Sequence, residues 1–265
     1  MSDLYRRLEG VILETDPGRK CEQTALLSRD WQSGRLMLDP QAEILTLEDP
    51  GRPELPRLVD PRRLERRSFA SPAGRIRLLH AFAHIEFNAI NIALDAAYRF
   101  RDLPRRFIAD WLRVAAEEAG HFSLLADELD RRGSGYGAHP AHGGLWDMVC
   151  RTRHDALHRM ALVPRVMEAR GLDVTPAMIA KFDQVGDAAA VEILQVIYRD
   201  EVGHVRIGDH WFRHLCARRC LDPEATFRSL VEQYMDGKLR GPFNWDARLA
   251  AGFDAPELEA LERGL

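Results

Sequence analysis

The chain has 265 residues, 46% of them hydrophobic and 29% charged, with a formal net charge of −4. This composition excludes disorder over most of the chain, and the near balance of charge gives no reason to expect a nucleic-acid binder. Four scattered cysteines exclude a disulfide framework and no apolar run is long enough to span a bilayer, so we expect a soluble cytoplasmic protein without a membrane partner.

The first 70 residues are rich in proline, glycine and aspartate, and their short apolar segments show no sustained helical period. We therefore expect residues 1–70 to form an irregular, extended arm over the main body. At Ser71 the pattern changes, because a serine followed by Pro72 is a common helix start. The apolar periodicity that follows predicts a long helix to Phe100.

Three further long helices are predicted downstream. The second begins near Pro104 and ends at Gly133, which is placed as a C-terminal cap glycine. After a glycine-rich loop, the third helix is predicted to end at Gly171. The fourth covers residues 175–219, with a break expected near Gly186.

The remaining tail predicts one more helix near residues 223–235, an irregular stretch and a short amphipathic end. No segment shows the alternation of a strand ladder, so the expected fold class is all-α. The economical architecture is a four-helix bundle at residues 71–220, with the N-terminal arm (1–70) and a C-terminal helical extension (221–265) packed around it.

Two Glu-x-x-His motifs carry the strongest chemical signal. Glu118 precedes His121, Glu201 precedes His204, and no other glutamate has a histidine three residues later. Residues three apart share one face of a helix, and each motif lies on an apolar stripe of a predicted long helix. A carboxylate beside an imidazole in an apolar seam is costly unless something neutralises it, and a metal ion would do so.

Each motif follows an isolated glutamate at nearly the same distance. Glu86 lies 32 residues before Glu118, and Glu168 lies 33 residues before Glu201. Bundles that hold two metals use a Glu-x-x-His from each of two helices and one glutamate from each of the other two. The repeat therefore predicts a dinuclear metal site with these ligands: Glu86, Glu118, His121, Glu168, Glu201 and His204.

The position of Glu168 supports a ligand role, because we expect it in the last turn before Gly171, where a negative charge opposes the helix dipole. Pro164, one turn earlier, should remove a backbone hydrogen bond and kink the helix close to the site.

Other polar residues near the motifs have competing interpretations. Glu192 competes for a ligand position but faces another side of its helix. Asp200 and Glu117 each precede a motif directly, and they can accept the second ring N–H of a metal-bound histidine or lie solvated at the surface. Tyr198 can act near the site as a hydrogen-bond donor or redox-active phenol, or serve only in packing.

The remaining histidines and one basic cluster fall outside the motif pattern. We expect four histidines not to bind metal, with the first of them near a helix surface: His80, His84, His154 and His158. Two more lie in the glycine-rich loop, which fits a mobile lid over a pocket or a solvated loop: His139 and His142. Four arginines can meet an anionic substrate, although a solvated face is the default: Arg62, Arg63, Arg66 and Arg67.

At these residues the sequence resembles the ferritin-like superfamily, and more closely a family within it known as a domain of unknown function. The segment with Glu168 is also similar to the corresponding helix of the di-iron monooxygenases that hydroxylate a modified tRNA base. The resemblance spans most of residues 80–253 and is carried by these stretches: HIEFNAINIALDAAYRF, FIADWLRVAAEEAGHF, YGAHPAHGGLWD, VPRVMEARGLDVTP, YRDEVGHVRIGDHWF and GPFNWDARLAAGF.

The resemblance implies a ferritin-like bundle with a non-haem centre of two metal ions, Fe/Fe or Mn/Fe, held by the six ligands named above. Iron-storage ferritins are plain bundles, whereas this chain adds extensions at both ends that can roof a substrate pocket. Oxygenase or oxidase chemistry is therefore favoured over storage.

The expected function is O2-dependent oxidation or hydroxylation of a small organic substrate. No flavin, nicotinamide or cysteine-rich motif is visible, so the electrons are expected from an external donor or a reductase partner. Three alternatives stay open, namely a ferroxidase or other iron-binding protein, a tRNA-modifying hydroxylase, and a metal-free structural bundle. A homodimer also stays open, because ferritin-like bundles often dimerise.

Overall fold

The computed structural model describes four stretches of the chain: residues 2–39, 41–65, 68–235 and 239–264. The fold is predominantly helical, as predicted, and the strands in these stretches amount to one two-residue pair. No helix among the described residues is both long enough and apolar enough to cross a membrane.

The chain forms two compact units, Met1–Cys150 (unit 1) and Arg151–Leu265 (unit 2). This division differs from the expected boundaries near residues 70 and 220. The physical reason is that the terminal helices pack onto the long helices of their own unit instead of forming separate layers.

Unit 1 begins with two helices that the sequence patterns did not predict. α1 (Leu4–Leu13) and α2 (Pro17–Gln32) each start at an aspartate whose carboxylate accepts a hydrogen bond from the backbone three residues later. The expectation of an irregular arm is wrong for these residues. The period of α2 is hard to detect because its buried face includes Lys20, Thr24 and Ser28.

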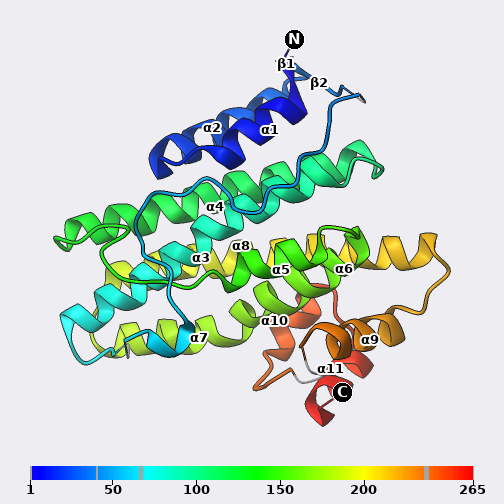
Figure 1. Ribbon diagram of the computed structural model, residues 1–265. Helices are drawn as coiled ribbons and strands as arrows, with labels where there is room; N and C mark the ends of the chain where they lie inside the picture. Colours follow the sequence, from blue (N-terminus) through cyan, green and yellow to red (C-terminus); the bar gives the residue numbers. More distant parts are fainter. Residues whose placement is uncertain (1, 40, 66–67, 236–238, 265) are drawn as a thin grey trace. The chain divides into compact units, whose positions relative to one another are not determined.

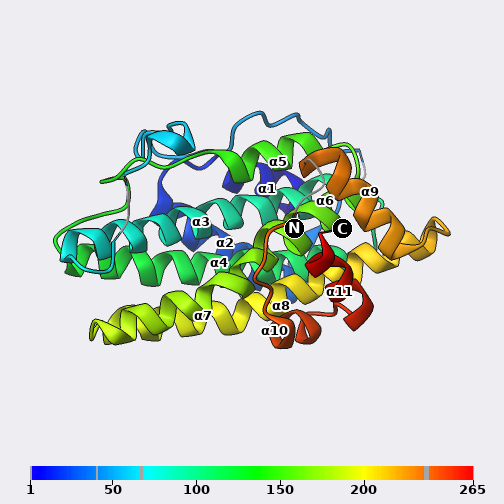
Figure 2. The same ribbon diagram turned by 90° about the horizontal axis from the view of Figure 1, so that it is seen from below.

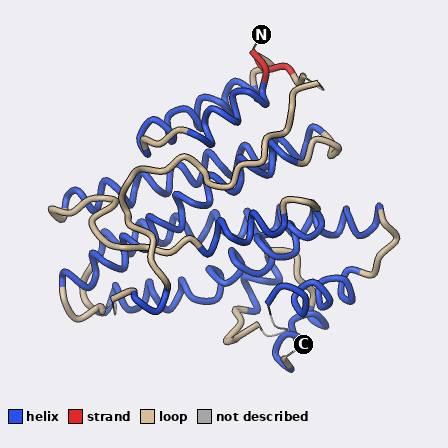
Figure 3. The backbone as a smooth tube through the Cα atoms, in the orientation of Figure 1, coloured by secondary structure: helices blue, strands red, loops and turns tan. Residues whose placement is uncertain are grey.

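The next part of the chain has little regular structure. β1 (Ser2–Asp3) and β2 (Leu36–Met37) pair in parallel, and an irregular connection with one short 3-10 turn, η1 (Pro61–Arg63), leads on to the first long helix (Figure 3). Leu58 forms a bridge with Ala141 of a later loop. The second half of the arm is therefore irregular, as expected.

Two long helices form the body of unit 1. α3 (Pro72–Arg99) begins where the serine–proline signal placed it, because the Ser71 hydroxyl accepts a hydrogen bond from the Gly74 N–H at 3.1 Å. α4 (Arg105–Arg131) ends before Gly133, which has a positive φ of 70°. Both predictions are confirmed.

α3 and α4 run antiparallel, and the two helices α1 and α2 pack against them (Figure 1). Aromatic pairs set the register of the hairpin, with ring centroids 5.4 Å apart for Phe87 and Phe122 and 6.3 Å apart for Phe100 and Phe107. In this register, residues of α3 and α4 whose numbers sum to about 208 lie opposite one another.

The third predicted helix has different bounds from those expected. After α5 (Gly144–Thr152) and a turn, three segments follow without interruption: α6 (Ala156–Leu162), a π-helix η2 (Val163–Glu168) and α7 (Ala169–Gln184). The predicted end at Gly171 is wrong. Gly171 lies inside α7 and lacks the positive φ of a cap glycine.

The rest of unit 2 is helical. The predicted break at Gly186 is confirmed by its φ of 71°, and α8 (Ala188–Arg218) then packs antiparallel to α7 (Figure 2). α9 (Pro223–Met235) lies where it was predicted. The stretch expected to be irregular contains the short helix α10 (Trp245–Ala250), and α11 (Ala255–Arg263) follows it.

Candidate metal centre

Unit 1 brings together one glutamate of α3 and the Glu-x-x-His motif of α4. Glu86, Glu118 and His121 are all buried, with at most 2% of each residue exposed. The apolar stripe predicted around the motif is confirmed, since Trp111 and Leu125 on the same face of α4 are buried too. Because Phe87 and Phe122 pair directly, their neighbours Glu86 and His121 lie at the same level of the hairpin.

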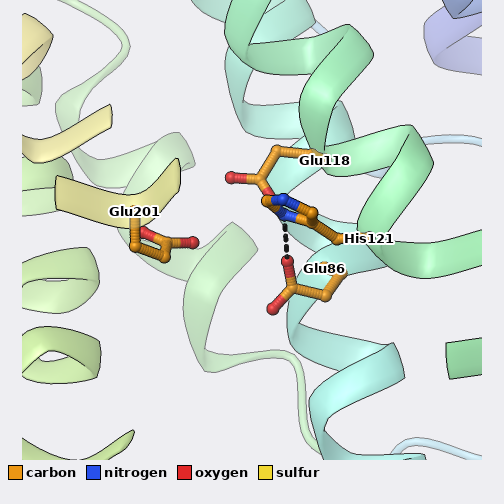
Figure 4. Close-up of side chains that lie close together, drawn as sticks. All are labelled: Glu86, Glu118, His121 and Glu201. Atoms are coloured by element: carbon orange, nitrogen blue, oxygen red, sulfur yellow. Dashed lines mark hydrogen bonds and ion pairs between the residues drawn. The ribbon is translucent and has the colours of Figure 1, made fainter. Parts of the chain in front are cut away.

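The ligand atoms in unit 1 converge on one ring nitrogen. His121 Nδ1 lies 3.2 Å from Glu86 Oε2 and 3.2 Å from Glu118 Oε2 (Figure 4). Ligand atoms around an ion with bonds of about 2.1 Å are spaced by about 3 Å, so the separations suit coordination. The ligand atoms of these three residues lie within 4.8 Å of one another and can hold a metal ion.

The buried charges perturb the protonation of this cluster. Burial raises the pKa of Glu86 well above its usual range, and the neighbouring Glu118 raises it further. Burial lowers the pKa of His121, but hydrogen bonds to Glu118 and Glu86 outweigh this effect and raise it to about 11. Without a cation, the cluster therefore holds a proton on His121, and its Nδ1–H donates to both carboxylates.

Unit 2 carries the second motif on α8. His204 Nδ1 lies 3.8 Å from Glu201 Oε1, so the same ring atom faces the motif glutamate as in unit 1. The His204 side chain is fully buried and that of Glu201 is 14% exposed. Figure 4 also draws Glu201.

Glu168 lies at the junction of η2 and α7 and is partly buried. The expectation that it occupies the last turn of a helix is wrong, because α7 continues for sixteen residues beyond it. The argument from the helix dipole therefore fails for Glu168. The backbone disturbance expected at Pro164 takes the form of the π-helix, a feature that is frequent at functional sites.

The acidic residues next to the motifs contact arginines of their own helices. Asp200 Oδ1 accepts a hydrogen bond from Arg199 Nε at 3.0 Å, and a Glu117 carboxylate oxygen lies 3.9 Å from Arg113 Nε. Their proposed bonds to metal-bound histidines stay predictions. Glu192, the competitor, is exposed.

The phenol of Tyr198 is fixed by the C-terminal segment. Its hydroxyl accepts a hydrogen bond of 2.9 Å from Asn244 Nδ2. Sequence reasoning missed Asn244, and its only signal was membership of the GPFNWDARLAAGF stretch.

The glycine-rich loop lies on α3 in unit 1. His80, expected near a surface, is buried because this loop covers it, and its Nε2 accepts a hydrogen bond from the Gly137 N–H at 2.9 Å. His84 Nε2 lies 3.1 Å from the His142 carbonyl, which only accepts, so Nε2 donates and Nδ1 accepts from the Tyr136 hydroxyl at 3.0 Å.

Two cavities meet at His84, one on the side of His80 and His142 and one on the side of Tyr136 and Trp146. The loop therefore forms walls for both cavities. His139 packs edge-on against His80, with ring centroids 5.4 Å apart.

The other residues singled out by sequence lie apart from these clusters. In unit 2, His154 and His158 contact each other, and His158 Nδ1 lies 2.9 Å from the Tyr234 hydroxyl. In unit 1, the first two arginines of the basic cluster are exposed in η1, and the other two lie outside the described residues: Arg62, Arg63, Arg66 and Arg67.

Comparison with known proteins gives a family but no activity. The model of a family described as "Protein of unknown function (DUF455)" matches residues 13–259. A Haemophilus influenzae protein described as "Uncharacterized protein" is 44% identical over 276 aligned residues, covering 98% of this chain and 93% of that protein. No solved structure matches the chain.

Proposed function

The chain belongs to the DUF455 family of proteins of unknown function, and from the chemistry of its own residues we propose that it is a non-haem di-iron oxidoreductase. In this proposal it activates O2 for the oxidation or hydroxylation of a small organic substrate. The observation that carries the proposal is the buried cluster of Glu86, Glu118 and His121.

The donor set of this cluster fits a divalent metal ion. Two buried carboxylates with one imidazolium leave a net negative charge in an apolar environment, which is unfavourable until a cation compensates it. A mixed carboxylate and imidazole set without thiolate suits iron or manganese. His121 would give up its Nδ1 proton to a bound ion, and Glu86 and Glu118 would balance the charge of that ion.

The second half of the proposed centre rests on the sequence repeat. Unit 2 carries Glu168 and the motif Glu201–His204 on two antiparallel helices, in the same order as the ligands of unit 1. We propose that the two hairpins form one ferritin-like four-helix bundle and that all six residues hold a pair of metal ions, Fe/Fe or Mn/Fe.

Iron ions held by such ligands supply the activation of O2. The surrounding side chains would keep water from the reaction, since Trp111, Phe87 and Phe122 are buried around the cluster. The electrons would come from an external donor or reductase, because the chain carries no motif for a redox cofactor of its own.

The test is metal content by plasma mass spectrometry on protein expressed with iron and manganese available. We expect about two ions per chain in the wild type and a loss in both Glu118→Gln and Glu201→Gln. The matched control is Glu192→Gln, an exposed glutamate on the same helix as Glu201. Negligible metal in folded wild-type protein, after reconstitution under anaerobic conditions, would refute the proposal.

A second measurement separates the oxygenase from a ferroxidase. Fe(II) oxidation that stops after the bound iron is consumed, with no substrate-dependent O2 uptake from a panel of small organic compounds and a chemical reductant, would favour the ferroxidase.

A further inference from the structure

The closest approach of η2 and α8 in unit 2 sets the level of the ligands. A Cβ added to Gly208 would lie 2.2 Å from Pro164 Cβ and Cγ, so glycine is required where the proline ring packs. Since the helices are antiparallel, one turn forward from Pro164 and one turn back from Gly208 reach the same level. These positions are Glu168 and His204.

A second connection between the same helices lies on the other side of that level. Asn244 Nδ2 donates to the Leu172 carbonyl of α7 at 3.1 Å and to the Tyr198 hydroxyl of α8 at 2.9 Å. Leu172 is one turn beyond Glu168, and Tyr198 is almost one turn before Glu201. The ligand level is therefore bracketed by the Pro164–Gly208 contact and by one side-chain amide.

A proline makes the Leu172 carbonyl available for this contact. Pro176 lies inside α7 and has no N–H to donate to the carbonyl four residues earlier, which is that of Leu172. The Asn244 amide takes the place of the missing donor. A carbonyl deprived of its helical partner is costly when buried, so this bond stabilises α7 at a point where its own backbone cannot.

Asn244 is itself held in place by all its polar groups. Its backbone N–H donates to Asp173 Oδ1 at 2.9 Å, and its Oδ1 accepts from the Ala247 N–H at the start of α10. Arg248 of α10 forms a buried two-point ion pair with Asp173, with bonds of 2.9 and 2.8 Å. The amide therefore acts from a rigid support.

We propose, on the basis of the proposed function, that Asn244 is a positioning residue for the unit 2 ligands. By joining α7 to α8, its amide holds Glu168 at a fixed distance from the Glu201–His204 motif and so sets the metal affinity of this half of the centre. The GPFNWDARLAAGF stretch, which no ligand belongs to, thereby acquires a role.

The experiment uses the full chain, freed of metal by a chelator and titrated with Co(II), with the visible d–d absorption recorded at each addition. We expect Asn244→Ala to weaken one of the two binding phases by about tenfold or more and to change its spectrum, as for other residues that orient metal ligands. The other phase should be unchanged, because unit 1 does not contain Asn244.

Two further variants sharpen the result. Tyr198→Phe removes a single acceptor of the Asn244 amide, so we expect a loss of about threefold in the same phase. Trp245→Phe is the matched control from the same stretch, because the Trp245 indole N–H donates to Glu262 and to neither α7 nor α8. This control should bind Co(II) like the wild type.

Each outcome separates the two proposals. Wild-type protein that binds no Co(II) overturns the metal centre and the positioning role together. Wild-type protein that binds two ions, with Asn244→Ala and Tyr198→Phe binding both equally well and with the same spectrum, overturns the positioning role and leaves the centre intact. Should Asn244→Ala fail to fold, the Tyr198→Phe titration decides between the same outcomes.

Discussion

In unit 1 the motif-bearing hairpin consists of two regular α-helices, and its ligands lie beside aromatic pairs with all three side chains buried. In unit 2 the corresponding hairpin contains a π-helix, an interior proline and a glycine contact, and its two acidic residues Glu168 and Glu201 are partly buried. The order of glutamates and histidines is the same in both.

The difference shows that one pattern of polar residues can be supported in two physical ways. Aromatic packing along α3 and α4 is sufficient to hold the ligands of unit 1. In unit 2 the irregular backbone leaves gaps in the helical hydrogen bonding, and side chains of the C-terminal stretch fill them. Breaking the supports of each hairpin tests this contrast.

The largest effect is expected at Arg165, which is fully buried in η2. It pairs with Asp209 at 3.1 Å and with Glu257, and its guanidinium lies among three phenylalanine rings. Arg165→Met would leave two buried carboxylates without this partner, and we expect a loss of about 4 kcal/mol in the free energy of unfolding by urea. Arg213→Met, which removes a partly exposed partner of the same carboxylates, should cost much less. Equal losses in the two variants would contradict the argument.

The next largest effect is expected from Gly208→Ala. The added methyl group would meet the rigid ring of Pro164 at 2.2 Å, so α8 must move, and we expect a destabilisation of about 3 kcal/mol. The control is Gly203→Ala on the same helix, where nothing lies within 4 Å of the new Cβ. A Gly208→Ala protein as stable as the wild type would show that the helices do not depend on this contact.

A pH effect should appear in unit 1. Burial lowers the pKa of Lys20 to about 7, although its Nζ donates to the Ile12 and Gly51 carbonyls at 2.8 Å. The unfolded chain keeps the usual lysine pKa near 10.5, so it binds one more proton than the folded chain between these two values. Stability due to Lys20 should therefore rise with pH by about 1.4 kcal/mol per unit above pH 7 and level off below it.

Lys20→Met tests this expectation in urea unfolding at pH 7, 8 and 9. The substitution should remove the slope that Lys20 contributes. An identical dependence on pH in both proteins would place the Lys20 pKa elsewhere.

The smallest effect is expected from Gly120→Ala, in the middle of the regular helix α4. No atom lies within 4 Å of the added Cβ, and alanine favours the helix, so we expect a gain of about 1 kcal/mol in the free energy of unfolding. Thermal unfolding measures this change. A loss of stability would contradict the view that α4 is an unstrained helix at this position.

Local signals were sufficient to predict α3, α4 and the break before α8. Ser71, Gly133 and Gly186 act through their own backbone geometry, so their meaning does not depend on distant residues. The convergence of Glu86 with His121 was predicted from spacing alone, because an antiparallel hairpin with a short connection fixes which residues face each other.

The rest depends on contacts between residues far apart in sequence. The end assigned at Gly171 was wrong because packing can hold a glycine inside a helix, and α1 and α2 were missed because the buried face of α2 is partly polar. The Asn244 bonds join residues 46 to 72 positions apart, and no local pattern reveals them. The six-ligand set and the metal itself stay predictions.

The place of Asn244 near the end of the chain has a consequence for synthesis. Translation delivers Leu172, Pro176 and Tyr198 long before Asn244, which follows Leu172 by 72 residues. The nascent unit 2 therefore carries both of its ligand helices before the amide that joins them has left the ribosome. A message truncated before codon 241 would encode every proposed ligand and still yield a chain whose α7 and α8 lack their common tie.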